Sequence, residues 1–206
     1  MSRYTGPRVK KMRALGIDLP GLSRKTMWER AYPPGEHGPR NARRRRESDF
    51  KKQLVEKQKL RFNYGLTEKQ FRRLFVEAKR DKAPTPDKLL EFLERRLDNA
   101  VFRAGFAPTI PAARQLVRHR HIRVNGKRVD IPSFRVSVGD EITVRDKSKE
   151  LAIVKESLEK ISLQRPEWMR FDEEKLVASM AELPTKDAVP FPVEMQLIVE
   201  YYSKRL

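Results

Sequence analysis

Cysteine is absent from the 206 residues of this chain, which excludes a disulfide framework and any thiolate metal site. No apolar run approaches the roughly 18 residues that a membrane-spanning helix needs. Positive charge near the N-terminus is not followed by an apolar segment, so a secretory signal is not expected. Glycine-rich phosphate loops and strained nucleophile turns are missing as well. These absences predict a soluble intracellular protein that lacks the motifs of the common enzyme classes.

Negative charge is also in short supply. Lysine and arginine number 46 against 28 aspartates and glutamates, a net charge of +18. The excess is uneven: residues 1–50 carry +8, residues 51–90 carry +7, residues 91–150 carry +5 and residues 151–206 carry −2. A coat of lysine that served solubility alone would be spread more evenly. Because such a charge repels itself in a compact chain, it predicts a polyanionic partner, most simply a nucleic acid.

Turn motifs and cation runs fill the first 47 residues. Examples are "YPPGEHGPRN" and "ARRRRE", and apolar periodicity is weak throughout this stretch. We therefore expect a basic extension that becomes ordered when phosphates neutralise its charge.

Helical patterns begin after this extension. Ser48 is a candidate N-cap for a helix that Gly65 ends, and Thr67 with Gln70 forms a capping box for the next helix. The proline-containing stretch at 83–88 then marks a candidate domain boundary.

A more specific pattern follows residue 88. The segment "LLEFLERRLDNAVFRAGF" predicts one amphipathic helix at 89–104, and "APTIPAARQLVRHR" predicts a second helix capped by Thr109. Next, "HIRVNGKRV" alternates apolar and basic residues up to Asn125-Gly126, a hairpin-turn signal. Further short strands are expected at 134–144. This unit is therefore predicted to consist of two helices followed by short strands.

This unit and several other motifs resemble a known family. The segment "ERRLDNAVFRAGFAPTIPAARQLVRHRHIRVNGKRVDIPSFRVSVGDEI" is similar to the RNA-binding module named after the fourth protein of the small ribosomal subunit. The motifs "RYTGPRVKKMRALG", "YPPGEHG", "EKQKLRFNYGLTEKQFRRLF" and "LIVEYYSKRL" extend the resemblance over nearly the whole chain, to the bacterial ribosomal protein family itself. Many members carry four N-terminal cysteines that bind zinc, so this chain resembles the zinc-free form.

The resemblance implies an α+β fold with three parts. They are a basic N-terminal extension at 1–47, a helical domain at 48–88 plus 188–206, and an inserted α/β domain at 89–187. The inserted domain would contain the RNA-binding module at 89–148, with helices packed on a small antiparallel sheet. The final segment "PVEMQLIVEYYSKRL" supports this insertion, because its apolar side needs the earlier helices to cover it.

The same resemblance implies a structural constituent of the small ribosomal subunit and no enzyme. Members of the family bind a multi-helix junction in the 5′ domain of 16S rRNA, nucleate assembly of the subunit body, and contribute to the mRNA entry channel and translational accuracy. The expected partners are 16S rRNA, ribosomal protein five, protein three near the mRNA entry site and, transiently, mRNA. No cofactor, DNA or membrane is expected, and the expected location is the small ribosomal subunit in the cytoplasm.

The candidate RNA contacts are cations and polar side chains that lie off the apolar stripes, because arginine grips phosphates bidentately and amides reach 2′-hydroxyls. We expect Arg114 and Arg118 on the exposed face of their helix, and we expect no catalytic or metal-binding residue. The set comprises Arg3, Arg8, Lys10, Lys11, Arg43, Arg44, Arg45, Arg46, Lys51, Lys52, Arg72, Arg73, Arg96, Arg103, Arg114, Gln115, Arg118, His119, Arg120, His121, Arg123, Asn125, Lys127 and Arg128.

Other functions make different demands on the sequence. A metal site would need His119, His121 and the distant His37, although side chains two positions apart point in different directions. Asp98 and Asp130 are more simply partners of nearby arginines than catalytic acids. An RNA-modifying enzyme would need a catalytic domain of about 150 residues beyond the module. A helix-turn-helix DNA-binding protein would need a free face on the second helix, which instead passes directly into a strand.

The predicted phosphate contacts have a measurable signature. If about ten cations neutralise phosphates, log K for 5′-domain rRNA falls against log salt concentration with a slope of about −7 to −9. Filter-binding titrations over a range of salt concentrations measure that slope. A slope near zero would contradict recognition of the phosphate backbone.

Overall fold

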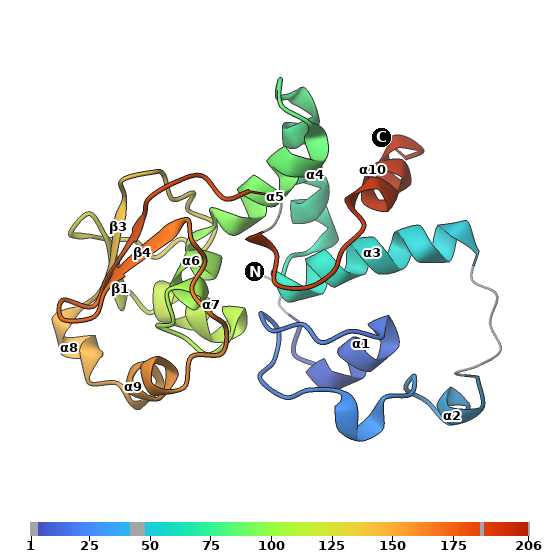
Figure 1. The fold of residues 1–206 in the computed structure, drawn as a ribbon, viewed down its shortest axis with the longest axis horizontal. Coiled ribbons are helices and arrows are strands. Elements are labelled where there is room, and N and C mark those ends of the chain that lie inside the picture. The colour runs from blue at the N-terminus through green and yellow to red at the C-terminus, as the bar shows by residue number, and fades with distance from the viewer. Residues whose placement is uncertain (1–3, 42–47, 186–187, 206) are drawn as a thin grey trace. The chain divides into compact units, whose positions relative to one another are not determined.

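The structure is a computed structural model that describes residues 4–41, 48–185 and 188–205 (Figure 1). The chain forms two compact units. One consists of the residues up to 86 and those from 191 onward, and the other consists of residues 87–190. The finer division into extension, helical domain and inserted domain stays a proposal.

Three helices form much of the first unit: α3 (Asp49–Asn63), α4 (Glu68–Arg80) and α10 (Met195–Ser203). Helices α3 and α4 begin at the capping residues that the sequence predicts. Ser48 accepts a hydrogen bond from Lys51 N–H at the start of α3, and the predicted capping box of Thr67 and Gln70 forms at the start of α4.

The apolar side of α10 is covered by the earlier helices, as predicted. Helix α10 lies alongside α3 (Figure 1). Ile198 and Tyr202 are buried, and the Tyr202 ring packs on Phe71 and Phe75 of α4 at centroid distances of 5.9 and 4.7 Å. The last helix of the chain therefore completes a core that the early helices begin.

A polar contact joins the same three helices. The Lys57 ammonium, only 3% exposed, lies 2.8 Å from Glu68 Oε2, and the Tyr202 hydroxyl donates to Glu68 Oε1 at 2.7 Å. Burial acts to raise the pKa of the Glu68 carboxyl, but hydrogen bonds from Lys57 and Tyr202 and the charges of Lys57 and Arg61 outweigh it and lower that pKa. Burial and the bond to Glu68 raise the pKa of Tyr202, so its hydroxyl remains a donor.

The N-terminal segment has apolar packing of its own. It buries Met12, Leu19 and Leu22, and Gly21 N–H donates to Asn63 Oδ1 at 2.9 Å, which ties the segment to the end of α3. Apolar residues scattered through turns make no repeating pattern, so periodicity alone does not predict this packing. The segment contains, in order, α1 (Arg8–Leu15), the 3₁₀ helix η1 (Trp28–Arg30) and α2 (Gly38–Asn41).

An antiparallel sheet of five strands forms one layer of the second unit, in the order β2-β1-β3-β5-β4. The first three strands belong to the predicted module, and the other two extend the same sheet. The predicted α+β class, with helices packed on a small antiparallel sheet, is confirmed. The strands are β1 (Ile122–Val124), β2 (Lys127–Arg128), β3 (Glu141–Val144), β4 (Met169–Asp172) and β5 (Val177–Met180).

Helices α6 (Leu97–Arg103) and α7 (Ile110–Arg118) lie beside this sheet (Figure 1). Thr109 caps α7 as predicted, accepting from Ala112 N–H. Helices α8 (Asp146–Lys149) and α9 (Ala152–Glu159) follow β3. None of the described helices combines the length and the apolar character that a bilayer crossing demands.

The prediction of one continuous helix at 89–104 is wrong. Two helices occupy the segment, α5 (Thr85–Glu94) and α6, and Arg96 is extended between them with φ −66° and ψ 138°. The apolar stripe continues across the break, so hydrophobic periodicity does not reveal it.

A distant loop causes the break. Phe134 O accepts from Leu97 N–H, and Val136 N–H donates to Arg95 O, both at 2.8 Å. Backbone groups that would have continued the helix are bonded to this loop instead. The same bonds correct our prediction of a strand near residues 134–138, where only an isolated bridge between Arg96 and Arg135 forms.

We expect Glu68→Gln to lower the free energy of unfolding by about 1–2 kcal/mol, because it removes the carboxylate partner of the buried Lys57 ammonium. Glu68 itself is 45% exposed, so solvent screening keeps the effect modest. The folded pKa of Glu68 lies below its ordinary value of 4.5, so the stabilisation is complete above that pH and is lost as the pH falls through the folded value. Urea unfolding at several pH values measures the difference between wild type and variant.

The matched control is Glu174→Gln, at an exposed position between β4 and β5. It should change the unfolding free energy by less than about 0.5 kcal/mol at every pH. Equal stabilities of wild type and Glu68→Gln at neutral pH would contradict the role assigned to this carboxylate.

Candidate nucleic-acid interface

Helix α7 ends in a left-handed turn that carries an arginine. Arg120 N–H donates to Val117 O at 2.9 Å and His121 N–H donates to Leu116 O at 3.0 Å, the pattern of a Schellman C-cap. The left-handed position of this motif is usually glycine, but here it is Arg120, with φ 63°. A non-glycine residue in this conformation costs on the order of 1 kcal/mol. Despite this cost, the turn places the Arg120 guanidinium at the surface, where its Nε donates to Asp130 at 3.0 Å.

The β1–β2 hairpin turns at Asn125-Gly126 as predicted, with φ of 50° and 75° at the two positions. The Asn125 side chain is used within the protein. Its oxygen accepts from Glu141 N–H at 2.9 Å, and its amide donates to Asp140 at 2.7 Å. Asn125 was predicted to contact RNA, but these bonds give its side chain the role of joining the hairpin to β3.

Two arginines lie opposite each other on adjacent strands. Arg123 of β1 is the register partner of Arg128 of β2. Directly opposed side chains share a face of the sheet, so like charges at these positions are destabilising. Asp146 lies 3.9 Å from the Arg123 guanidinium, but its side chain is 78% exposed and offsets little of this repulsion. A bound anion would relieve the repulsion.

Six basic side chains surround these features, and we call them the module cluster. All are exposed except Arg123, which is half-buried. The end of α7, the turn after it and the β1–β2 hairpin fix their spacing. Gln115 is exposed one turn before the end of α7. The module cluster consists of Arg118, His119, Arg120, Arg123, Lys127 and Arg128.

The two neighbouring histidines differ in environment. His119 is exposed, whereas His121 is partly buried with its Nδ1 2.8 Å from Ser148 Oγ. Burial lowers the pKa of His121, and the charges of His119 and Arg145 lower it further. His121 is therefore neutral near pH 7 and anchors α8. Within the described residues, no group of three or more His, Cys, Asp or Glu is arranged to hold a metal ion.

Arg96 and Arg103 are buried, which corrects our prediction that they lie at the surface. They are 6% and 4% exposed. Arg96 pairs with the fully buried Asp98 at 2.9 Å, and Arg103 Nε donates to the fully buried Glu94 at 3.1 Å. The break between α5 and α6 turns these arginines toward buried carboxylates, so they are structural residues and not surface contacts.

Arg114 also faces a carboxylate and is not on the exposed face that we predicted. Its side chain is 15% exposed, and its guanidinium donates to Asp98 at 2.6 Å. Arg118, one turn later, is exposed as predicted. The prediction that Asp98 and Asp130 pair with nearby arginines is confirmed, since Asp130 holds Arg120.

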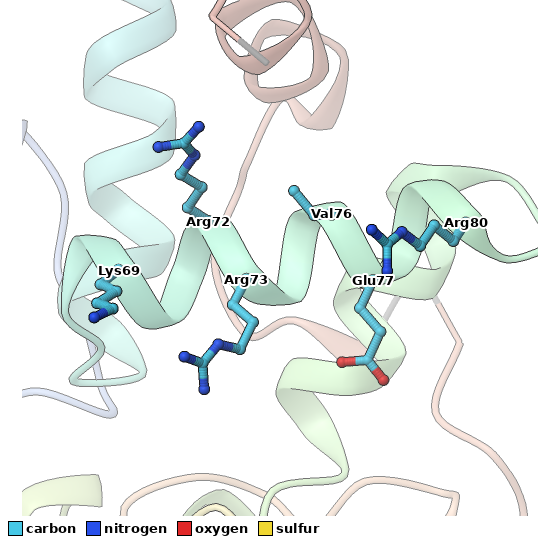
Figure 2. Close-up of a pocket in the computed structure, with 6 residues that line it drawn as sticks. All are labelled: Lys69, Arg72, Arg73, Val76, Glu77 and Arg80. Carbon is cyan, nitrogen blue, oxygen red and sulfur yellow. The ribbon is translucent and has the colours of Figure 1, made fainter.

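A second basic surface lies on α4 in the first unit. A surface hollow of about 390 Å³ is lined by residues of this helix alone (Figure 2). Arg72 and Arg73 were predicted contacts and are exposed there. Our set of contacts omitted Lys69 and Arg80, although the apolar face of α4 leaves both positions toward solvent. The lining residues are Lys69, Arg72, Arg73, Val76, Glu77 and Arg80.

The remaining predicted contacts within the described residues lie on α1 and α3. Arg8 donates to Leu22 O at 3.3 Å, and the Lys11 ammonium lies over the Tyr4 and Phe62 rings at 5.3 and 5.1 Å, so both have internal partners. Those that lie outside the described residues are Arg3, Arg43, Arg44, Arg45 and Arg46. On the described helices, Lys10 and Lys52 are exposed and Lys51 is half-buried.

A basic cluster on a small α+β unit is typical of RNA-binding proteins, and comparisons with known proteins identify the family. Residues 3–94 match the family model described as ribosomal protein S4/S9 N-terminal domain, and residues 95–142 match the S4 domain. The chain is 62% identical to small ribosomal subunit protein uS4 of Methylobacillus flagellatus and 58% identical to small ribosomal subunit protein uS4B of Nitrosomonas europaea, each over 100% of both chains. Identity to uS4 of Pediococcus pentosaceus is 50%, over 99% of this chain and 100% of that one.

The chain belongs to the uS4 family of small ribosomal subunit proteins. It is therefore a structural component of the small ribosomal subunit and not an enzyme, as the sequence predicted. Family membership also confirms its expected place, in the small ribosomal subunit of the cytoplasm.

Truncation of the two arginines of α7 should have different effects on stability. Arg114→Ala should lower the free energy of unfolding by about 1–3 kcal/mol, because the fully buried Asp98 loses one of its two guanidinium partners. Arg118→Ala should change it by less than about 0.5 kcal/mol. Urea denaturation followed by circular dichroism compares them. Equal loss of stability in both variants would show that the Arg114–Asp98 pair does not matter to the fold.

Proposed function

We propose that the protein is a primary rRNA-binding assembly protein that binds a multi-helix junction in the 5′ domain of 16S rRNA. In this role it nucleates assembly of the subunit body. The observation that carries the proposal is the module cluster, whose six basic side chains are exposed apart from the half-buried Arg123 and lie on the end of α7, the turn after it and the β1–β2 hairpin.

Two features of the module cluster favour an external polyanion over a merely solvated charge run. Arg123 and Arg128 are kept opposite each other although they repel, and Arg120 is kept in a left-handed conformation that favours glycine. The exposed partners Asp130 and Asp146 offset only part of what these two arrangements cost, because exposed ion pairs contribute little to stability. Both arrangements place guanidinium groups at defined spacing, which suits phosphates of a folded RNA.

Recognition of this kind reads shape and backbone. The major groove of A-form RNA is too deep and narrow for side chains to read bases, so a duplex is recognised through phosphates and 2′-hydroxyls. Gln115, exposed beside Arg118, can reach a 2′-hydroxyl. Where several RNA helices meet at a junction, their phosphates face in several directions. A folded protein whose cations lie on more than one element can contact such phosphates together.

The α4 hollow is a second proposed contact for the same RNA. Lys69, Arg72, Arg73 and Arg80 bring four cations around it, and Glu77 is the acid among its lining residues. Lys69 lies three and four positions before Arg72 and Arg73, so it neighbours both on the helix surface, whereas Arg80 lies about two turns beyond Arg73. A phosphate in the hollow would lie within reach of more than one of them.

The resemblance to the family extends the proposal to neighbours in the subunit. We expect contact with ribosomal protein five, and with protein three where mRNA enters the small subunit. Transient contact with mRNA and an influence on translational accuracy would follow from that position.

Removing two cations from the module cluster should weaken rRNA binding. We expect Arg118→Gln with Arg128→Gln to raise Kd for a 5′-domain 16S rRNA transcript about tenfold or more, and to make the salt slope less steep by about 1.5–2. The fold should be unaffected, because Arg128→Gln removes the repulsion with Arg123. Filter binding at several salt concentrations, with thermal unfolding alongside, measures both.

The control removes the same charge from the opposite edge of the sheet. Arg170→Gln with Lys175→Gln changes β4 and the turn after it, whereas the test variant changes β2 and the end of α7. An equal loss of affinity in both variants would mean that net charge alone acts. Equal affinity of the wild type for duplex DNA and for the transcript would contradict a dedicated rRNA-binding role.

A further inference from the structure

Trp28 is exposed on a turn of the N-terminal segment. Its relative exposure is 72%, whereas Trp168, the second of the two tryptophans in the chain, is 5% exposed. An indole ring left in water forgoes the stabilisation that burial of a large aromatic surface gives. Within the described part of the chain, Trp28 makes none of the ring or cation contacts that occupy other aromatic residues.

The turn that carries Trp28 is held in place from both sides. Met27 N–H donates to Asp18 Oδ1 at 2.8 Å, and Arg30 N–H closes the turn on Met27 O at 3.0 Å. After the turn, Arg13 Nε donates to Tyr32 O at 3.0 Å. The exposure of the indole is therefore a feature of an anchored turn.

The surroundings of Trp28 are cationic. Arg24, Lys25 and Arg30 are exposed on the same segment, and Glu29 is the acid beside them. Tyr32 is less available than Trp28, because the Arg13 guanidinium lies 4.7 Å above its ring. A flat aromatic face, with exposed cations before and after it in the sequence, matches an anionic ligand that has a flat aromatic group of its own. Single-stranded RNA, with its phosphates and unstacked bases, has that chemistry.

We propose that Trp28 is a stacking platform for one unpaired base of the RNA that this protein binds, with Lys25 and Arg30 on the flanking phosphates. The inference rests on the proposed rRNA-binding function and adds a base contact to a surface otherwise assigned to phosphates. Stacking accepts any base, so this contact favours an unpaired nucleotide and not a particular sequence.

The chain contains a built-in reporter for this contact. In a Trp168→Phe background, Trp28 is the only tryptophan, and stacking on a base should quench its fluorescence and shield it from acrylamide. The titrant is the 5′-domain 16S rRNA transcript. Heparin, a polyanion without bases, is the matched control and should bind without quenching. If Trp168→Phe fails to fold, the difference in emission between wild type and Trp28→Phe isolates the same signal.

Substitutions at Trp28 separate stacking from simple apolar contact. Trp28→Ala should raise Kd for the transcript about 5- to 150-fold, the range for loss of one base stack. Trp28→Leu should lose nearly as much although it remains apolar, and Trp28→Phe should keep most of the affinity. Thermal unfolding should be unchanged in all three, since most of the ring is exposed to solvent.

The failure of this inference can be told from failure of the proposed function. If the transcript binds tightly but Trp28 emission and the affinity of Trp28→Ala are unchanged, stacking is wrong and rRNA binding stands. If heparin quenches Trp28 as strongly as the transcript does, the ring senses charge and not a base, which also overturns the inference. If Trp28 becomes shielded only after other ribosomal proteins are added, it contacts protein. A wild-type chain that does not bind the transcript would overturn both proposals.

Discussion

The buried carboxylates of the second unit set the positions of its helices. Asp98 and Glu94 are fully buried, and an ionised carboxylate at such a site is tolerated only when it is paired. Asp98 binds Arg96 and Arg114, so one side chain joins the start of α6 to the middle of α7. Glu94 binds Asn99 and Arg103. Because these bonds fix α7, they also fix where its last turn presents the module cluster.

Arginine therefore has two separate uses within one short region. Three arginines satisfy buried carboxylates and hold the helices. Those at the end of α7 and in the hairpin lie nearer the surface, where Arg123 and Arg128 face and repel each other. The surface group is maintained at a cost, seen in the left-handed Arg120 and the facing pair of Arg123 and Arg128. Local rules are broken most often where a site serves a partner. A polyanion is the partner that gives both departures a reason.

In the first unit, too, cations lie on elements whose opposite faces are packed against the rest of the unit. The Glu68 carboxylate accepts hydrogen bonds from Lys57 and Tyr202, so three helices separated in sequence meet at one carboxylate. That contact and the aromatic packing of Tyr202 fix α4, whose outer face carries the hollow. The N-terminal segment is anchored to α3 through Asn63, and from it Trp28 projects. Phosphate contacts and the inferred base contact would thus rest on rigid supports.

Sequence alone determined what depends on neighbouring residues: the caps at Ser48, Thr67 and Thr109, the Asn125-Gly126 hairpin, and the basic character of the surface. These are local because a cap or a turn involves residues a few positions apart. Tertiary structure alone decided the break between α5 and α6 and the burial of Arg96, Arg103 and Arg114. Each depends on a distant group, either the backbone near Phe134 or a carboxylate that the fold brings close. Periodicity places an arginine off an apolar stripe, but only the folded chain shows whether water or a buried carboxylate lies there.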